Sequence, residues 1–153
     1  MKLPSSSERV SRNTVADVNA RIAEMLRDNI EYYSRRSRFE IERRLDELDQ
    51  EWDIERVLQV NAAAVSLTGF VAAGLLGRRA LVVPVAVAGF LLQHALQGWC
   101  PPMPFLRRMG FRTSREIQEE RYAMKALRGD FEGIDEAVDP EWKVEEVFRR
   151  VSH

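Results

Sequence analysis

The fold is decided by two apolar runs, VLQVNAAAVSLTGFVAAGLLG (57–77) and ALVVPVAVAGFLLQHALQGW (80–99), separated only by Arg78 and Arg79. Neither run contains an Asp, Glu, Lys or Arg. At 1.5 Å of rise per residue each run is about 30 Å long as a helix, which matches the hydrocarbon core of a bilayer. The pattern predicts two transmembrane helices joined by a tight turn.

The rest of the chain is strongly polar, and bulk averages hide this division. Charged residues make up 31% of the 153 residues, the net charge is −1 and the mean hydropathy is −0.33. Such averages are typical of a soluble protein, yet nearly all the charges lie outside residues 57–106. We therefore expect an all-α fold in which a two-helix transmembrane hairpin is flanked by amphipathic cytoplasmic helices. The balanced charge gives no reason to expect a nucleic-acid partner.

Local signals divide the chain into four parts. Residues 1–13 are polar and Ser-rich, which predicts a disordered tail. Residues 14–53 form an amphipathic helical arm that is exposed or self-associating, or that lies on the lipid surface. Residues 54–106 form the hairpin, with Asp53 as the N-cap of its first helix. Residues 107–153 form a second cytoplasmic helical arm, in which 113–116 read as a capping box, Gly129 ends the helix, and Asp139 with Pro140 opens the last one.

Basic residues are distributed unevenly around the two runs. The turn has two arginines, whereas more basic residues flank the outer ends, which places both termini in the cytoplasm. The flanking residues are Arg38, Arg43, Arg44, Arg56, Arg107, Arg108, Arg112, Arg115, Arg121 and Lys125.

Small residues recur at four-residue spacing in the first run. Gly69, Ala73 and Gly77 form one series, and Ala62 and Ser66 form another. This spacing allows helix backbones to approach closely in lipid. We expect it to serve packing within the hairpin rather than a dimer, although both uses remain open.

Cys100 is the single cysteine, so the chain has neither an intramolecular disulfide nor a multi-cysteine zinc site. Its place at a predicted helix C-terminus raises the pKa of a thiol, which favours a structural cysteine packed under Trp99 over a reactive one. Hydrogen bonds with Gln93, Gln97 or Asn61 are sufficient to explain His94. No cofactor or metal is expected, and the sequence indicates no catalytic activity.

The end of the second run carries the motif Gly98-Trp99-Cys100-Pro101. A hairpin closed by this motif resembles the YgaP-type transmembrane domain family, in which a Gly and a Thr follow, here Gly110 and Thr113. The resemblance covers residues 54–113 and implies an inner-membrane location and homo-oligomerisation. Some members are fused to a rhodanese domain, which is absent here, so sulfurtransferase activity is not carried over. The prolines at 101, 102 and 104 predict a non-helical turn at the membrane surface.

Three functional hypotheses follow. The first is a non-enzymatic integral membrane protein that acts as a membrane-anchored interaction or oligomerisation module through its helical arms. The second is a thiol or persulfide carrier that uses Cys100 alongside a separate sulfurtransferase. The third is a soluble helical bundle that buries the two apolar runs.

Overall fold

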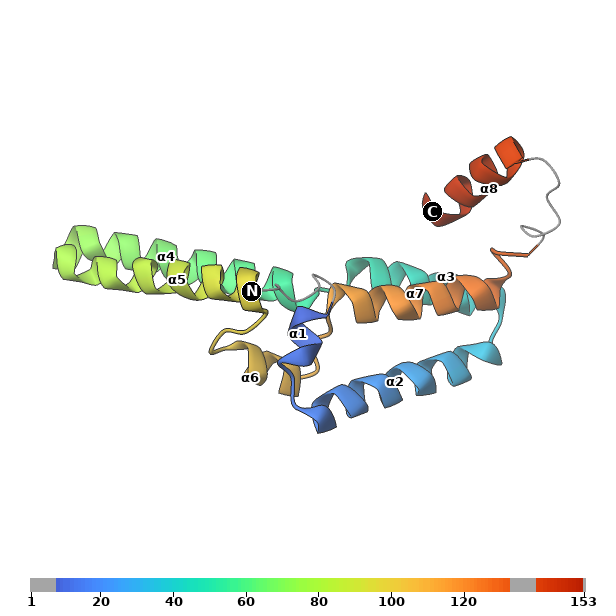
Figure 1. Ribbon diagram of the computed structural model, residues 1–153, viewed down its shortest axis with the longest axis horizontal. Helices are drawn as coiled ribbons and strands as arrows, with labels where there is room; N and C mark the ends of the chain where they lie inside the picture. The colour runs from blue at the N-terminus through green and yellow to red at the C-terminus, as the bar shows by residue number, and fades with distance from the viewer. Residues whose placement is uncertain (1–7, 133–139, 153) are drawn as a thin grey trace. The chain divides into compact units, whose positions relative to one another are not determined.

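In the computed structural model, which describes residues 8–132 and 140–152, every regular element is a helix. The expected all-helical class is confirmed over these residues. The chain forms two compact units, the first from residues up to 25 and 51–117, and the second from 26–50 and the residues after 117. Figure 1 labels the helices along the chain.

The hairpin belongs to the first unit. Helix α4 spans Ile54–Leu76, the 3-10 helix η1 spans Arg78–Leu81 and helix α5 spans Val82–Gln97. The helices α4 and α5 lie side by side (Figure 1). Asp53 accepts a hydrogen bond from the backbone N of Arg56 at 2.7 Å, which confirms the predicted N-cap. Both long helical stretches are apolar enough to cross a membrane by length and composition.

The small residues of α4 differ in what they contact. Gly69 is buried, and a β-carbon built on it would lie 2.7 Å from Cδ of Pro84 in α5. Ala62, Ser66 and Ala73 are half-buried. Gly77 is exposed, and its φ of +103° makes it a turn residue instead of a packing residue.

A short helix, α1, spans Arg9–Arg12, within the segment expected to be a disordered tail. That expectation is wrong for these four residues, and residues 1–7 lie outside the described part. The physical reason is Val10, which is 3% exposed in an apolar cluster with Ile54, Leu58 and Met103. A single apolar side chain in a polar stretch gives no periodic signal in the sequence.

Helix α6 spans Met103–Arg108, so the proline-rich turn contains the start of a helix. Pro104 lies in the first turn, where backbone N–H groups have no partner inside the helix and a missing one costs little. The expectation of a fully non-helical segment was therefore too broad. Residues 98–102 still lie outside any helix and contain a turn, as the prolines predict.

The second unit contains α3 (Arg38–Gln50) and α8 (Pro140–Ser152). Helices α2 (Ala16–Ser34) and α7 (Ser114–Arg128) each contribute to both units. Within the second unit, the fully buried Glu120 of α7 accepts hydrogen bonds from Asn29 of α2 at 3.1 Å and Arg44 of α3 at 2.9 Å. One carboxylate thus joins three helices. The proposed cap of α8, Asp139, lies outside the described residues.

The ends of α7 follow the predicted signals. The backbone N of Thr113 donates to Glu116 Oε2 at 2.8 Å, and the backbone N of Glu116 donates to Thr113 Oγ1 at 3.2 Å. This reciprocal pair is the expected capping box. Gly129, with φ +86°, follows the last helical residue as predicted.

Candidate functional site at the base of the hairpin

Cys100 lies in an apolar cluster at the base of the hairpin, which is the end where α4 begins and α5 ends. It is 3% exposed and packs in a group with Val10, Ile54, Leu58 and Met103. Trp99, which was expected to cover the cysteine, is not a member of this cluster and is more than one-third exposed. The cysteine therefore has the environment of a small apolar core residue.

The environment of the Cys100 thiol disfavours its ionisation. Burial raises the pKa of Cys100, and a backbone hydrogen bond from Met103 offsets only part of that effect. Because the thiolate is the nucleophilic form, a thiol whose pKa is raised is poorly reactive at neutral pH. The burial of Cys100 and the raised pKa of its thiol indicate a structural role for this residue.

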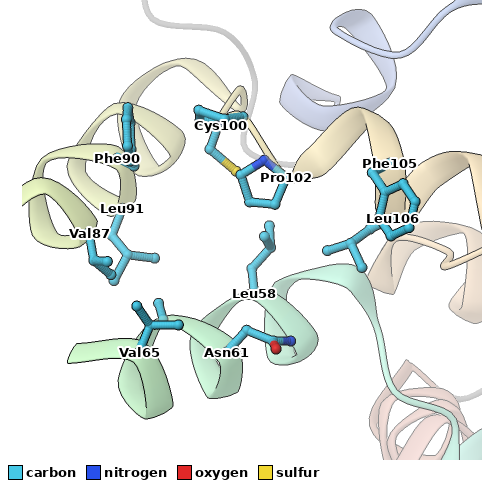
Figure 2. A pocket seen from close by; sticks show the side chains of 12 residues that line it. Leu58, Asn61, Val65, Val87, Phe90, Leu91, Cys100, Pro102, Phe105 and Leu106 are labelled. Atoms are coloured by element: carbon cyan, nitrogen blue, oxygen red, sulfur yellow. The ribbon is translucent and has the colours of Figure 1, made fainter. Parts of the chain in front are cut away.

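An open pocket of about 430 Å³ lies beside Cys100. Figure 2 shows Val65 and Leu58 of α4, Val87 and Leu91 of α5, and Cys100 around it. Its lining is almost entirely apolar and contains no Asp, Glu, His, Lys or Arg. The Cys100 thiol is the one titratable side chain among the residues that line the pocket. Sequence reasoning missed the pocket because its walls come from three separate segments of the chain, residues 58–65, 87–91 and 100–106.

Asn61 is the amide that lines this pocket (Figure 2). Its Nδ2 donates to the carbonyl oxygen of Val57, one turn earlier in α4, at 2.8 Å. The side chain therefore satisfies part of its hydrogen-bonding capacity within its own helix. It does not form the bond across the hairpin to His94 that we expected.

The structure explains why a glycine, Gly98, occupies the first position of the Gly-Trp-Cys-Pro motif. It ends α5 with φ +76°, a left-handed conformation that glycine adopts without strain. A β-carbon at this position would lie 2.5 Å from the backbone carbonyl atoms of Arg9. Gly98 therefore provides both the turn after α5 and the space in which α1 packs. Trp99 and Pro101 are exposed.

Helix α1 and the residue after it bind the end of α5 through polar contacts. Arg9 forms an ion pair with Glu55 at 2.7 Å and donates to the carbonyl oxygen of Ala95 at 3.2 Å. Asn13 Nδ2 donates to the carbonyl oxygen of Gln97 at 2.8 Å. The last carbonyls of a helix lack partners within it, so these bonds satisfy groups that would otherwise need water. We call this set of five residues the α1 clasp.

His94 lies in the last turn of α5 and is 6% exposed. In the part of the chain that the structure describes, neither ring nitrogen has a hydrogen-bond partner. The expected bonds to Gln93, Gln97 or Asn61 are therefore not formed within these residues. The amide of Asn61 donates within its own helix instead. A buried imidazole without partners is unusual, since burying a polar group without a hydrogen bond costs free energy.

Arg107 is the most buried basic residue among the described residues of the first unit. Its terminal nitrogens donate to the two carboxylate oxygens of Glu116 at 2.7 and 2.8 Å. It also donates to Thr14 Oγ1 at 3.2 Å, to Asn19 Oδ1 at 3.0 Å and to the carbonyl oxygen of Phe111 at 3.1 Å. Sequence reasoning counted Arg107 only as a flanking charge. In the structure it joins α6 to the starts of α2 and α7.

The base of the hairpin shows no metal site. Among residues 8–132 and 140–152 there is no group of three His, Cys, Asp or Glu side chains placed to hold a metal ion. Comparison with protein families, with curated proteins and with solved structures found no match. The resemblance to the YgaP-type family stays a prediction. The structure thus defines a helical protein with an apolar two-helix hairpin. At the base of the hairpin, an apolar cluster is accompanied by ion pairs and hydrogen bonds.

Proposed function

We propose that the chain is a non-enzymatic integral membrane protein in which the α4–α5 hairpin crosses the cytoplasmic (inner) membrane and the remaining helices form an interaction module on its cytoplasmic side. The exposure of the hairpin is the observation that carries this proposal. In the most apolar stretches of the first and second hairpin helices, only 17% and 11% of the residues are buried. Such a continuous apolar surface in water would be strongly unfavourable.

Individual side chains support the same conclusion. Near the turn, Leu75 and Leu76 of α4 are 79% and 84% exposed. On α5, Val82 and Val85 are exposed to a similar degree. Transfer of one such side chain out of water stabilises a protein by about 1.5–3 kcal/mol. Lipid around the hairpin provides this stabilisation, whereas the soluble-bundle hypothesis needs a protein cover over these residues.

The asymmetry of basic residues supports an orientation with both termini in the cytoplasm. Arg78 and Arg79 are exposed at the turn, while the larger group of basic residues flanks the two apolar runs in the sequence. In short loops the side with more Lys and Arg stays in the cytoplasm. The thiol-carrier hypothesis gains no support from the structure, because Cys100 is buried and the pKa of its thiol is raised.

Membrane insertion is tested by fractionation and by cysteine accessibility. The expected result is that the protein stays in the membrane pellet after carbonate extraction. In a Cys100→Ser background, Arg79→Cys should react with an impermeant thiol reagent added outside intact cells. The matched variant Ser34→Cys, exposed at the last residue of α2, should react only after the membrane is opened. Release by carbonate, or labelling of both cysteines from one side, would contradict the proposal.

The interaction module is proposed to act through exposed apolar side chains of the second unit. Phe39 of α3 is 72% exposed and Tyr32 of α2 is 53% exposed. Association with a second copy or another protein would remove these rings from water. Phe39→Ser should reduce the assembly size measured by light scattering in detergent, whereas Glu42→Ser on the same helix should not. A monomeric wild-type protein, or equal behaviour of both variants, would contradict self-association.

A further inference from the structure

A second pocket of the first unit, about 140 Å³ in volume, lies between the first half of α2 and the end of α6. Its lining side chains are either apolar or carry a guanidinium group, and none of them is acidic. They are Val18, Arg21, Ile22 and Met25 of α2, together with Arg107, Arg108, Met109 and Gly110 at the end of α6. We call this pocket the arginine pocket.

Arg107 joins the two walls of the arginine pocket. From α6 its guanidinium donates to Asn19 Oδ1 of α2 at 3.0 Å, and Glu116 binds the same guanidinium at 2.7 and 2.8 Å. The carboxylate neutralises the charge of Arg107, so this residue builds the pocket without adding free charge to it. Arg108 follows Arg107 on α6, and Arg21 lies two residues after Asn19 on α2. The contact that joins the helices therefore brings Arg21 and Arg108 to the same pocket.

Arg21 and Arg108 carry charges that the fold leaves unpaired. Both are exposed, and the side chain of neither forms an ion pair or hydrogen bond with any part of the chain that the structure describes. Arg21 is unpaired although Asp17 and Glu24 lie about one turn away on either side of it. Guanidinium groups match the geometry of phosphate oxygens and form strong charge-assisted hydrogen bonds with them. The pocket therefore has the chemistry of a phosphate site.

Apolar side chains are exposed beside the two guanidinium groups. Met109, next to Arg108, is 59% exposed, and Phe105, one turn earlier, is 66% exposed. Residues four positions apart on a helix share a face, so both side chains project on one side of the α6 segment. A free phosphate ion would gain nothing from these side chains. Cations beside exposed apolar groups suit an amphiphile, in which a phosphate is attached to hydrocarbon chains.

The position of α6 fits the same ligand. Met103, at the start of α6, is fully buried in the cluster with Ile54 and Leu58 of α4, so α6 is held at the base of the hairpin. When the hairpin crosses the membrane as proposed above, this end lies at the level of the cytoplasmic headgroups. Anionic lipids of the cytoplasmic leaflet attract basic side chains that lie close to the membrane surface.

We infer that the arginine pocket binds one anionic phospholipid of the cytoplasmic leaflet, with its phosphate between Arg21 and Arg108 and its hydrocarbon chains beginning at Met109 and Phe105. The inference rests on the proposed membrane location of the hairpin, to which it adds a specific lipid partner. A headgroup with a net negative charge is preferred over phosphatidylcholine, because the ammonium group of phosphatidylcholine would be repelled by the two guanidinium groups.

The test measures the affinity of the detergent-solubilised full chain for a fluorescent phosphatidylglycerol. Unlabelled phosphatidylglycerol should displace this probe at a concentration at least about fivefold lower than phosphatidylcholine with the same acyl chains. Each basic side chain near anionic lipid contributes about a factor of five. Arg21→Gln and Arg108→Gln should therefore each weaken binding about fivefold. Arg27→Gln is the matched control, because Arg27 is exposed on α2 and does not line the pocket.

Three results would overturn the inference: equal competition by the two lipids, an equal loss of affinity in Arg27→Gln, or displacement of the probe by inorganic phosphate at the concentration that phosphatidylglycerol requires. The last result would indicate a site for free phosphate. Membrane insertion is measured separately by the carbonate extraction described above. A protein that stays in the membrane pellet but binds both lipids equally keeps the proposed function and loses this site, whereas release by carbonate contradicts the proposed function itself.

Discussion

Gly69 of α4 and Pro84 of α5 meet so closely that a single added carbon on Gly69 would lie 2.7 Å from the proline ring. At the corresponding position of Gly74, on the same helix, no atom of another described element lies within 4 Å. We predict that Gly69→Ala lowers the free energy of unfolding by about 1–3 kcal/mol through overpacking. Gly74→Ala should be neutral or slightly stabilising, because alanine favours a helix. The free energy of unfolding of both variants is measured in detergent mixtures. Equal changes in Gly69→Ala and Gly74→Ala would refute close packing at Gly69.

Arg107 and Arg108 are neighbours on α6 with opposite environments. Arg107 is 1% exposed and binds Glu116 through two hydrogen bonds, whereas Arg108 is exposed. Arg107→Met should cost about 3–5 kcal/mol, because it leaves a largely buried carboxylate without its partner. Arg108→Met should change stability by less than about 0.5 kcal/mol. Chemical denaturation of the two variants in detergent measures this difference, and similar losses would show that the buried pair is not a major stabilising contact.

The same ion pair predicts how stability depends on pH. Burial alone would raise the pKa of Glu116, but hydrogen bonds from Arg107 and the backbone of Thr113 outweigh it and lower that pKa. A folded-state pKa below the unfolded one gives stability that is present above about pH 4.3, the usual glutamate value, and is lost as pH falls through the folded pKa. The stability difference between wild type and Glu116→Gln should therefore shrink in acid. A constant difference down to low pH would contradict the lowered pKa.

Cys100 is predicted to resist modification in the folded protein. Burial covers the thiol and raises its pKa, so both access and the thiolate fraction are low. A water-soluble maleimide at neutral pH should label Cys100 only after unfolding. Ser34→Cys in a Cys100→Ser background is the exposed control and should react at once. Rapid labelling of native Cys100 would revive the thiol-carrier hypothesis.

The sequence predicted those features of the fold that depend on nearby residues. Asp53 and the Thr113–Glu116 box were recognised because a cap and its partner lie within one helical turn. The hairpin was recognised because a run without charge is visible in any window of the right length. These signals are local, and the structure retains them.

The contacts at the base of the hairpin could not be predicted in the same way. The bonds from Arg9 and Asn13 reach residues 86 and 84 positions later, and no local pattern encodes such a pairing. Arg107 was counted among the basic residues that indicate membrane orientation, because its neighbours in sequence are also basic. In the structure its guanidinium is buried and forms hydrogen bonds with Glu116 and other groups. His94 was given hydrogen-bond partners by proximity along its helix or across the hairpin, and the fold provides none in the described residues.

The long reach of the α1 clasp has a consequence for biosynthesis. Residues 9–13 leave the ribosome well before Ala95 and Gln97, so α1 cannot dock until the second apolar helix has been translated and has reached its place. During that interval Val10 and Arg9 are open to chaperones and proteases. Docking of α1 is therefore a late step, which follows the synthesis of the whole hairpin.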